Sequence, residues 1–287
     1  MNNRRNKLED ALFLAPAVMV SALFLLIPLI SCFYYSVTNF DGFTQNFRFV
    51  GMRNFRNLLT DLEYMQSLKT TFLITGVGVI YSNVFGILVA VWMDHKSRAF
   101  NFSKSLLFIP CILSSVVVSF IWSYMTQSNN GVINNILSMM RVPGVDFFAS
   151  SLTITFMVAW VINWAAFGLY LTIYDASIKT IPPELFEAAI VDGAGPATRF
   201  WRITLPLLYP GITICTVLSM IGGLRQFDFV KIVTPKQIYT VTVYAVERAF
   251  DFNMYGYASA IVLVLFVLIV ALSALQLMLM KRFEVDY

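Results

Sequence analysis

The sequence predicts an all-α, polytopic membrane protein with six transmembrane helices and a short helical segment between the fourth and fifth. Of its 287 residues, 58% are apolar and only 13% are charged, and the mean hydropathy is +0.73. A soluble domain carries about a quarter charged residues. The charged residues are clumped between uncharged runs of about 20 residues, the length that an α-helix needs to cross a bilayer. The chain is therefore expected to fold as one transmembrane domain.

Each uncharged run is one predicted span. The predicted spans are residues 12–32, 70–93, 105–125, 151–174, 205–224 and 257–280. The first run is too long for the core of a signal peptide and no small-residue cleavage site follows it, so it is expected to remain as an anchor. Lysine and arginine occur at nearly twice the density in the segments that are cytoplasmic if the N-terminus is inside. This predicts a multi-pass protein with both termini cytoplasmic.

Several function classes find little support in the sequence. The net charge of +4 is small and scattered, which argues against a nucleic-acid partner. Cys32, Cys111 and Cys215 lie in apolar runs and are expected to be buried thiols, with no metal-ligand spacing around them. No phosphate-binding Gly-x-x-x-x-Gly-Lys-Ser/Thr loop occurs. The single histidine, His95, lies at a loop edge, which argues against a catalytic triad. We expect a non-enzymatic chain with no cofactor or metal of its own.

A polar segment over residues 182–204 separates the fourth and fifth spans. Pro183 suits the first turn of a helix, and Glu184 and Glu187 are placed early, where the helix dipole favours carboxylates. Gly193 is suited to end that helix, and Pro196 can begin a second one. The segment is expected to form two short helices with small residues for close packing. It can insert into a groove on another protein, or it can be a connector lying on the membrane surface.

The same segment carries a family resemblance. Glu187-Ala188-Ala189, then Gly193, then Ile203 followed by Leu205-Pro206, resembles the EAA loop of membrane subunits of bacterial ATP-driven (ABC) importers, and its flanks resemble the carbohydrate branch. In that family the loop is the coupling helix that docks on a cytoplasmic ATPase. The resemblance implies that the coupling residues are Glu184, Glu187, Ala188, Ala189, Asp192, Gly193 and Ala194.

The resemblance also implies a function and partners. It implies a permease subunit in the bacterial cytoplasmic (inner) membrane that translocates a carbohydrate, an oligosaccharide above all, by alternating access. The solute is delivered by an extracytoplasmic solute-binding protein. A second permease chain of the same family completes a heterodimer within the membrane lipid. Two ATPase subunits bind ATP and Mg, and this chain binds neither.

Two stripes of residues are candidates for the substrate path. Ile162, Ala165, Ala166 and Leu169 form one stripe at i, i+3, i+4 and i+7 on a helix face, and residues 219–226 form a second stripe at the same spacing. The second stripe is small and polar. They are either tight packing surfaces or walls of the path, at positions that the resemblance aligns with the sugar pocket of maltose-type permeases. The residues here are smaller than in those permeases, which argues against maltose itself. Trp160 and Trp164 can stack on a sugar ring, or they can lie at helix interfaces or membrane boundaries. The candidate path residues are Trp164, Ala165, Ala166, Leu169, Ser219, Gly222, Gly223 and Gln226.

Two other functions are alternatives to an ABC permease. A secondary, ion-coupled carrier usually needs an intramembrane carboxylate or histidine, and no predicted span has an Asp, Glu, Lys or Arg near its centre. A membrane scaffold would have a dry, tightly packed interior between the fourth and fifth spans. Asn83 and Asn163 lie mid-span and are expected to face other helices, in packing rather than in substrate contact. Residues 236–240, after the fifth span, lack the family's glycines and are expected to form a shorter, less mobile loop.

Overall fold

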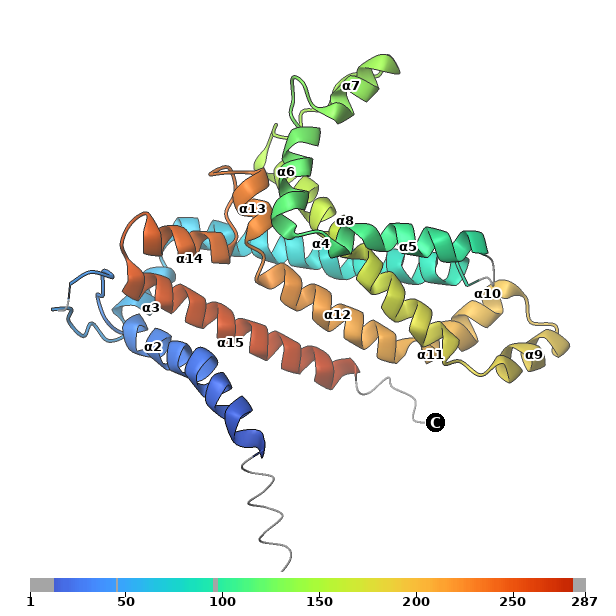
Figure 1. The fold of residues 1–287 in the computed structure, drawn as a ribbon, viewed down its shortest axis with the longest axis horizontal. Coiled ribbons are helices and arrows are strands. Elements are labelled where there is room, and N and C mark those ends of the chain that lie inside the picture. The colour runs from blue at the N-terminus through green and yellow to red at the C-terminus, as the bar shows by residue number, and fades with distance from the viewer. Residues whose placement is uncertain (1–12, 45, 95–97, 281–287) are drawn as a thin grey trace, which may run out of the picture. The chain divides into compact units, whose positions relative to one another are not determined.

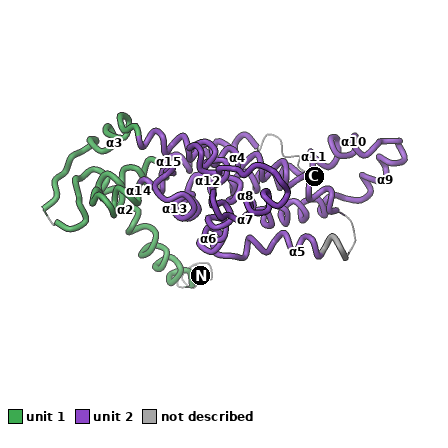
Figure 2. Tube along the Cα trace, turned by 90° about the horizontal axis from the view of Figure 1, so that it is seen from above, with its two compact units in different colours: residues 1–62, 245–266 green, residues 63–244, 267–287 purple. Residues whose placement is uncertain are grey.

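The computed structural model describes residues 13–44, 46–94 and 98–280. His95 and the two charged tails lie outside these residues. Within them the chain is helical, and the only β pairing is an isolated bridge between Thr38 and Phe49. The chain divides into two compact units (Figure 2): residues 1–62 with 245–266, and residues 63–244 with 267–287.

Four of the described helices are long and apolar enough to cross a membrane. They are Phe13–Ser36, Leu62–Trp92 (α4), Ser151–Lys179 (α8) and Tyr255–Met280 (α15). Two further candidates are bent pairs: Phe102–Ile112 of α5 (Arg98–Ile112) with α6 (Ser115–Met125), and Pro196–Leu207 with α12 (Tyr209–Leu224). Counted as one span each, the bent pairs bring the number to six. The predicted all-α membrane class is confirmed.

The predicted continuous span 105–125 is not one straight helix. α5 and α6 meet at 98° (Figure 1). Pro110 lies in the last turn of α5, where its missing N–H removes one intrahelical hydrogen bond. Ser114 then has ψ 139°, an extended conformation that starts α6 in a new direction. The sequence pattern shows only that the run is apolar, and it does not reveal this bend.

The first unit contains a π-helical turn, η1 (Ala22–Leu26), with α2 (Ile27–Ser36), α3 (Arg53–Leu58) and the first part of α15. Asn54 on α3 is buried and donates hydrogen bonds from Nδ2 to the carbonyls of Ser36 (2.8 Å) and Thr38 (2.9 Å). These bonds fix α3 against the end of α2. None of the apolar window of Phe13–Ser36 is buried within the chain, so the surface of that window is available for lipid or for another protein.

The second unit is built around α8, which packs against α5, α6, α12 and α13 (Asp228–Val233). Ser150 caps the start of α8, since its hydroxyl accepts a hydrogen bond from the Thr153 amide at 3.1 Å. The remaining elements are α7 (Val132–Met139), α9 (Pro183–Val191), α10 (Pro196–Arg199), η2 (Phe200–Thr204), α11 (Leu205–Leu207) and α14 (Val241–Phe250), in which the unit boundary falls.

Glycines bring the helices of the second unit close together. A Cβ on Gly168 of α8 would lie 2.6 Å from the Cα of Phe108 on α5, and one on Gly223 of α12 would lie 2.8 Å from the Cα of Thr75 on α4. Real side chains do not tolerate such distances. Backbone approach of this kind is how small residues join helices in membranes, where the hydrophobic effect between helices is weak.

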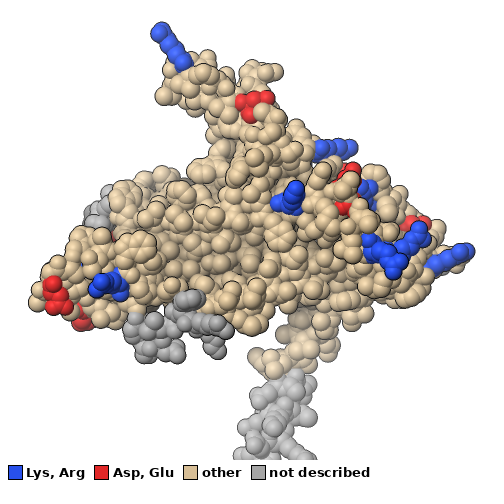
Figure 3. Space-filling view, turned by 180° about the vertical axis from the view of Figure 1, so that it is seen from behind, with Lys and Arg blue, Asp and Glu red and all other residues tan. Residues whose placement is uncertain are grey.

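The outer surface of the chain is largely apolar. The face drawn in Figure 3 shows a wide area without charged side chains. Large apolar side chains of the second unit are exposed, including Phe85, Trp92 and Phe156 at 48%, 66% and 47%. Contiguous exposed apolar surface of this kind marks contact with lipid or with another protein.

Candidate functional site

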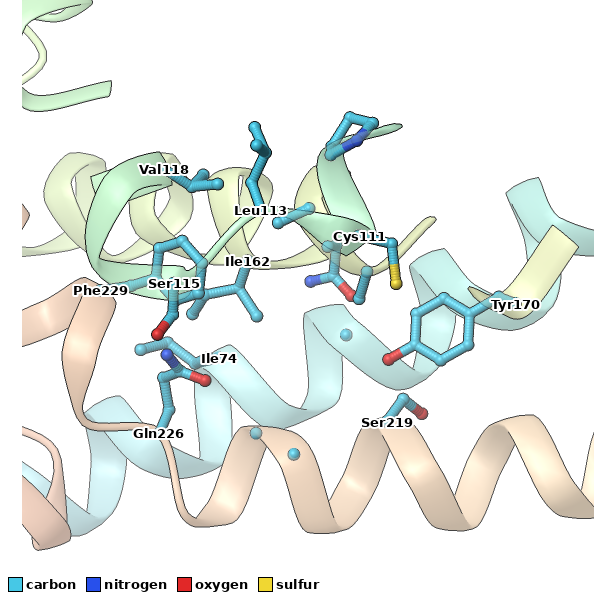
Figure 4. Close-up of a pocket in the computed structure, with 17 residues that line it drawn as sticks. Ile74, Cys111, Leu113, Ser115, Val118, Ile162, Tyr170, Ser219, Gln226 and Phe229 are labelled. Carbon is cyan, nitrogen blue, oxygen red and sulfur yellow. The ribbon is translucent and has the colours of Figure 1, made fainter. Parts of the chain in front are cut away.

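A cavity of about 250 Å³ lies inside the second unit. It is partly open and is lined by α4, the α5–α6 bend, α8, α12 and the start of α13 (Figure 4). α8 and α12 contribute mainly small side chains to its lining, which leaves the space unfilled. A Cβ added to Gly222 would meet no atom within 4 Å. The interior between the two helices is therefore not tightly packed, contrary to what a scaffold without a solute path requires.

Most of the residues proposed for the substrate path line this cavity. They are Ala165 and Ala166 from the first stripe, and Ser219, Gly222, Gly223 and Gln226 from the second. Trp164 lies elsewhere, with its ring packed edge-on against Trp122 of α6 at 5.4 Å between ring centroids. Leu169 is 38% exposed and does not line the cavity.

Gln226 reaches the cavity in a way that the helical pattern does not predict. α12 ends at Leu224, so Gln226 lies in the short connection before α13 rather than on the stripe of Ser219 and Gly222. Its side chain nevertheless points from this connection toward Ile74 and Ser115 (Figure 4). Gln226 therefore lines the site for which it was predicted, but it does not lie on the helix from which its spacing was derived.

Other lining residues are not indicated by the sequence. The α5–α6 bend supplies Pro110, Cys111, Leu113 and Ser115, because the break in the helix turns its backbone toward α8. Nothing in the apolar pattern indicates that bend. Asn163 is visible in the sequence as a polar residue in mid-span, and it lines the cavity while its Nδ2 donates to the carbonyl of Ala159 at 2.7 Å.

The chemistry of the cavity is polar but uncharged. None of its 17 described lining residues is Asp, Glu, Lys, Arg or His. Hydroxyl and amide groups of Ser115, Asn163, Tyr170, Ser219 and Gln226 are distributed among apolar side chains. Amides and hydroxyls can both donate and accept hydrogen bonds. The arrangement can therefore bind an uncharged solute that has hydroxyl groups and an apolar face.

The segment between α8 and α12 forms the two predicted short helices, α9 and α10. α9 ends with Asp192 as its C-cap, followed by Gly193 at φ 74°. The amide of Gly193 donates to the carbonyl of Ile190 (3.0 Å), and that of Ala194 to the carbonyl of Ala189 (2.8 Å). This pair of bonds is a Schellman motif, which needs a left-handed residue at the Gly193 position.

All seven proposed coupling residues lie on this exposed corner. Glu184, Glu187, Ala188, Asp192 and Gly193 are exposed, while Ala189 and Ala194 are half-buried. Among the described residues no ion pair involves either glutamate. The last residue of α9, Val191, is 88% exposed and its neighbour Ile190 is 57% exposed. An exposed helix end with both apolar and acidic side chains is suited to contact with another protein.

The fold agrees with comparisons to known proteins. Residues 82–285 match the family described as binding-protein-dependent transport system inner membrane component. The multiple sugar-binding transport system permease protein of Streptococcus mutans is 31% identical over 98% of each chain. The trehalose/maltose transport system permease protein of Thermococcus litoralis is 26% identical over 96% of this chain and 97% of the relative.

Solved structures show the same fold. A chain of a bacterial ABC transporter involved in the import of the acidic polysaccharide alginate superposes with a TM-score of 0.84 at 22% identity, covering 97% of this chain and 96% of the other. The chain therefore belongs to the family of inner-membrane components of binding-protein-dependent transport systems. The resemblance found in residues 187–206 is confirmed.

Proposed function

We propose that this chain is one of two membrane subunits of an ATP-driven importer that moves an uncharged oligosaccharide across the bacterial cytoplasmic membrane. The cavity between α8 and α12 carries this proposal. Its hydroxyl and amide groups suit the hydroxyls of a sugar, and its aromatic residues Tyr170 and Phe229 offer apolar faces of the kind on which sugar rings pack. Two relatives have names that refer to sugars: multiple sugars in one case, trehalose and maltose in the other.

The absence of charged residues among the described lining residues favours a neutral sugar. A polymer of uronic acids such as alginate carries a carboxylate on each sugar, and burying those charges without basic partners is costly. None of the 17 described lining residues here is basic. We therefore propose a different substrate from alginate, although this chain shares its fold with an alginate importer.

The size of the cavity supports a second permease chain. Pockets that enclose a small ligand are usually about 300–1,000 Å³, and the cavity of this chain is about 250 Å³. One chain therefore provides part of the path, and a related chain provides the rest. The exposed apolar side chains of the second unit offer surface for that partner and for lipid.

In this proposal, α9 transmits a conformational change from an ATPase subunit to the helices that line the cavity. α9 follows α8 directly, and α10, η2 and α11 lead from it into α12 (Figure 1). A displacement of α9 therefore acts on both helices that line the cavity. In the proposed mechanism α9 docks on an ATPase subunit that binds ATP and Mg. Closure of the ATPase dimer moves α9, and α8 and α12 alternate between outward-open and inward-open arrangements.

A binding protein is proposed to deliver the sugar on the outer side. A solved structure with the same fold, a bacterial alginate ABC transporter, is in complex with an alginate pentasaccharide-bound periplasmic protein, and one of its chains covers 98% of this chain with a TM-score of 0.84. With α9 on the cytoplasmic side, the density of lysine and arginine favours cytoplasmic positions for both termini as well.

The proposed function can be tested by reconstitution. The chain is purified with its co-purifying subunits, reconstituted in liposomes, and supplied with loaded binding protein and a panel of trehalose, maltose, raffinose, maltotriose and an alginate trisaccharide. We expect uptake of at least one neutral sugar that requires internal ATP and persists after an uncoupler collapses ion gradients. Uptake that follows the ion gradient, or that is restricted to the alginate trisaccharide, contradicts the proposal.

The cavity itself is tested by a size series at Gly222. Replacement by Ala, Val and Phe adds increasing volume to open space, because no atom lies within 4 Å of a Cβ there. Uptake should fall stepwise, and longer sugars should be affected before shorter ones. Ile214→Phe, at a half-exposed position of the same helix, is the control. A Gly222→Phe chain that transports at the normal rate excludes this cavity from the path.

A further inference from the structure

Gln226 lines the cavity without the support of a helix. α12 ends two residues before it and α13 begins two residues after it. A residue inside a helix has its direction set by the regular backbone bonds, whereas a residue in a connection can turn its side chain in several directions. Its backbone amide is held loosely, by a 3.3 Å bond to the carbonyl of Gly223. Something else has to set the direction of this side chain.

The carbonyl of Gln226 is held by two threonine hydroxyls that lie 14 and 16 residues further along the chain. Thr240 Oγ1 donates to it at 2.7 Å and Thr242 Oγ1 donates to it at 2.5 Å. The two hydroxyl oxygens are 3.1 Å apart. A carbonyl oxygen has two lone pairs, so both of its acceptor sites are used. Two bonds from different directions fix the orientation of the peptide plane that follows Gln226, and with it the direction of the Cα–Cβ bond.

The two threonines are themselves anchored to α4, another helix that lines the cavity. Thr240 is completely buried, and Val241 between them donates its amide to Thr71 Oγ1 on α4 at 3.0 Å. Thr71 is also completely buried and donates to the carbonyl of Ser67 at 2.7 Å. The backbone of Gln226 is therefore connected to α4 through hydrogen bonds at the start of α14. Residues 236–240, predicted from their lack of glycine to be less mobile, end at this anchor.

The side-chain amide of Gln226 has no hydrogen-bond partner among the described residues. It points into the cavity with one acceptor and two donors available (Figure 4). A pair of neighbouring sugar hydroxyls offers the complementary donor and acceptor. The amide can distinguish a sugar that has both hydroxyls from one that lacks either, because a site built to hydrogen-bond a hydroxyl rejects an analogue without it.

We infer that Thr240 and Thr242 are positioning residues that aim Gln226 into the cavity, and that they thereby set the hydroxyl selectivity of the importer. The inference rests on the proposed function for its substrate, a neutral sugar. Its geometric part, the direction of the Gln226 side chain, does not depend on transport.

The geometric part is tested by thiol accessibility in the detergent-solubilised complex. Cys32, Cys111 and Cys215 are replaced by Ser, Gln226 is replaced by Cys, and the rate of reaction with a small, charged methanethiosulfonate is measured. Thr240→Val with Thr242→Val keeps the side-chain shape but removes both donors. This double variant should change the reaction rate about 10-fold, which corresponds to about 1.4 kcal/mol. Thr240→Ser with Thr242→Ser keeps both hydroxyls and should stay within about 2-fold. Equal rates in all three chains overturn the inference.

The matched control is Thr234→Val, in the segment that leads to the same loop. Thr234 is also completely buried, but its hydroxyl donates to the carbonyl of Val230 at 2.9 Å and not to Gln226. This variant should leave the reaction rate unchanged. If the double Val variant does not assemble, Thr242→Val alone removes one of the two bonds from a half-buried residue, and it should give a smaller change of about 3-fold. No change in that single variant then overturns the inference.

The selectivity part is tested by transport at saturating loaded binding protein. The probe is the neutral sugar that the unmodified complex takes up fastest, with its series of monodeoxy analogues, and the readout is the uptake ratio of sugar to analogue. A purely structural defect slows all sugars alike and leaves that ratio unchanged. Gln226→Ala and the double Val variant should both lose discrimination against the same analogue, by about 10-fold, and the double Ser variant should retain it.

The two proposals fail in different ways. If no neutral sugar is taken up by the unmodified complex, the proposed function fails, while the thiol reaction still decides whether the threonines direct residue 226. If Gln226→Ala loses discrimination but the double Val variant keeps it, the cavity stands and the positioning role of the threonines is overturned.

Discussion

The hydroxyl of Tyr174 on α8 donates a 2.7 Å hydrogen bond to Oδ1 of Asn83 on α4. The Nδ2 of Asn83 reaches Thr216 Oγ1 on α12 at 3.1 Å and the carbonyl of Val79 at 2.7 Å. Three helices around the cavity are thus joined by one amide. A polar side chain in mid-span needs such partners, which explains why Asn83 can lie there. For Asn83, the predicted preference for helix packing over substrate contact agrees with these bonds, whereas Asn163 lines the cavity.

Removing the Tyr174 hydroxyl should loosen this connection. Tyr174→Phe leaves the ring in place and deprives Asn83 of its closest donor, and we expect a loss of about 1 kcal/mol in the free energy of unfolding. Asn83→Leu should cost more, about 2 kcal/mol, because it leaves two hydroxyls inside the unit with weaker partners. Thermal unfolding of the solubilised complex measures both.

Tyr124→Phe is the control for that series. Tyr124 lies on α6 with 58% of its surface exposed, so loss of its hydroxyl should leave the unfolding temperature nearly unchanged. Equal shifts for the two Tyr→Phe chains would show that the bond to Asn83 adds nothing to stability.

The ring of Tyr174 also depends on a glycine of α4. A Cβ on Gly86 would lie 2.8 Å from Cε2 of Tyr174, so Gly86→Ala must displace a fully buried ring. We expect a loss of about 1–3 kcal/mol, the usual cost of overpacking. Gly76 lies on the same helix, where an added Cβ would meet no atom within 4 Å, and Gly76→Ala should be neutral or stabilising by up to about 1 kcal/mol. Similar unfolding temperatures for the two variants would contradict this contact.

Much of the architecture could be predicted because its causes are local. The length of an apolar run determines whether it can cross a bilayer, and prolines and glycines determine where α9 and α10 begin and end. Gly193 illustrates this, since its φ of 74° is what a Schellman motif requires. The small residues of α8 and α12 could be recognised as candidates for the cavity lining because small side chains leave space on whichever face of a helix they lie.

The remainder depends on contacts between distant segments. The bend after Pro110 follows from how α5 and α6 pack on α8, because proline inside a membrane helix is compatible with a straight or a bent path. Trp164 is adjacent in sequence to Ala165 but faces Trp122, a partner that only the bend brings within reach. Gln226 is held by Thr240 and Thr242, and no periodic pattern links those positions.

An ion pair holds the start of the α5–α8 contact. Lys104 on α5 pairs with Asp175 on α8, whose second oxygen accepts from Lys179 at 2.6 Å. The Lys104 and Asp175 side chains are only 18% and 16% exposed. Asp175→Asn leaves Lys104 mostly buried without its carboxylate, and we expect a loss of about 1–3 kcal/mol in unfolding free energy, between the values for surface and fully buried pairs.

Removing both members of this pair should cost less than removing one. Lys104→Met with Asp175→Leu eliminates the unpaired charge and should recover most of the loss. Lys179→Met, at a side chain that is 62% exposed, should cost under about 0.5 kcal/mol. If the double variant is no more stable than Asp175→Asn, the two charges do not act as a pair.

Gly193 allows the backbone of the coupling loop to be tested separately from its surface. Gly193 and Gly195 both have open space around a Cβ, but Gly193 has φ 74° and Gly195 has φ −70°. Only at Gly193 does alanine force a side chain into the left-handed region, at a cost of about 1 kcal/mol or more. We expect Gly193→Ala to lower ATP-driven uptake while membrane insertion stays normal, and Gly193→Asn to be milder because asparagine tolerates that region.

Gly193→Asp adds a charge beside α9 and should uncouple hydrolysis from uptake. Gly195→Ala should transport normally. If Gly193→Asp transports normally, α9 is not the coupling helix.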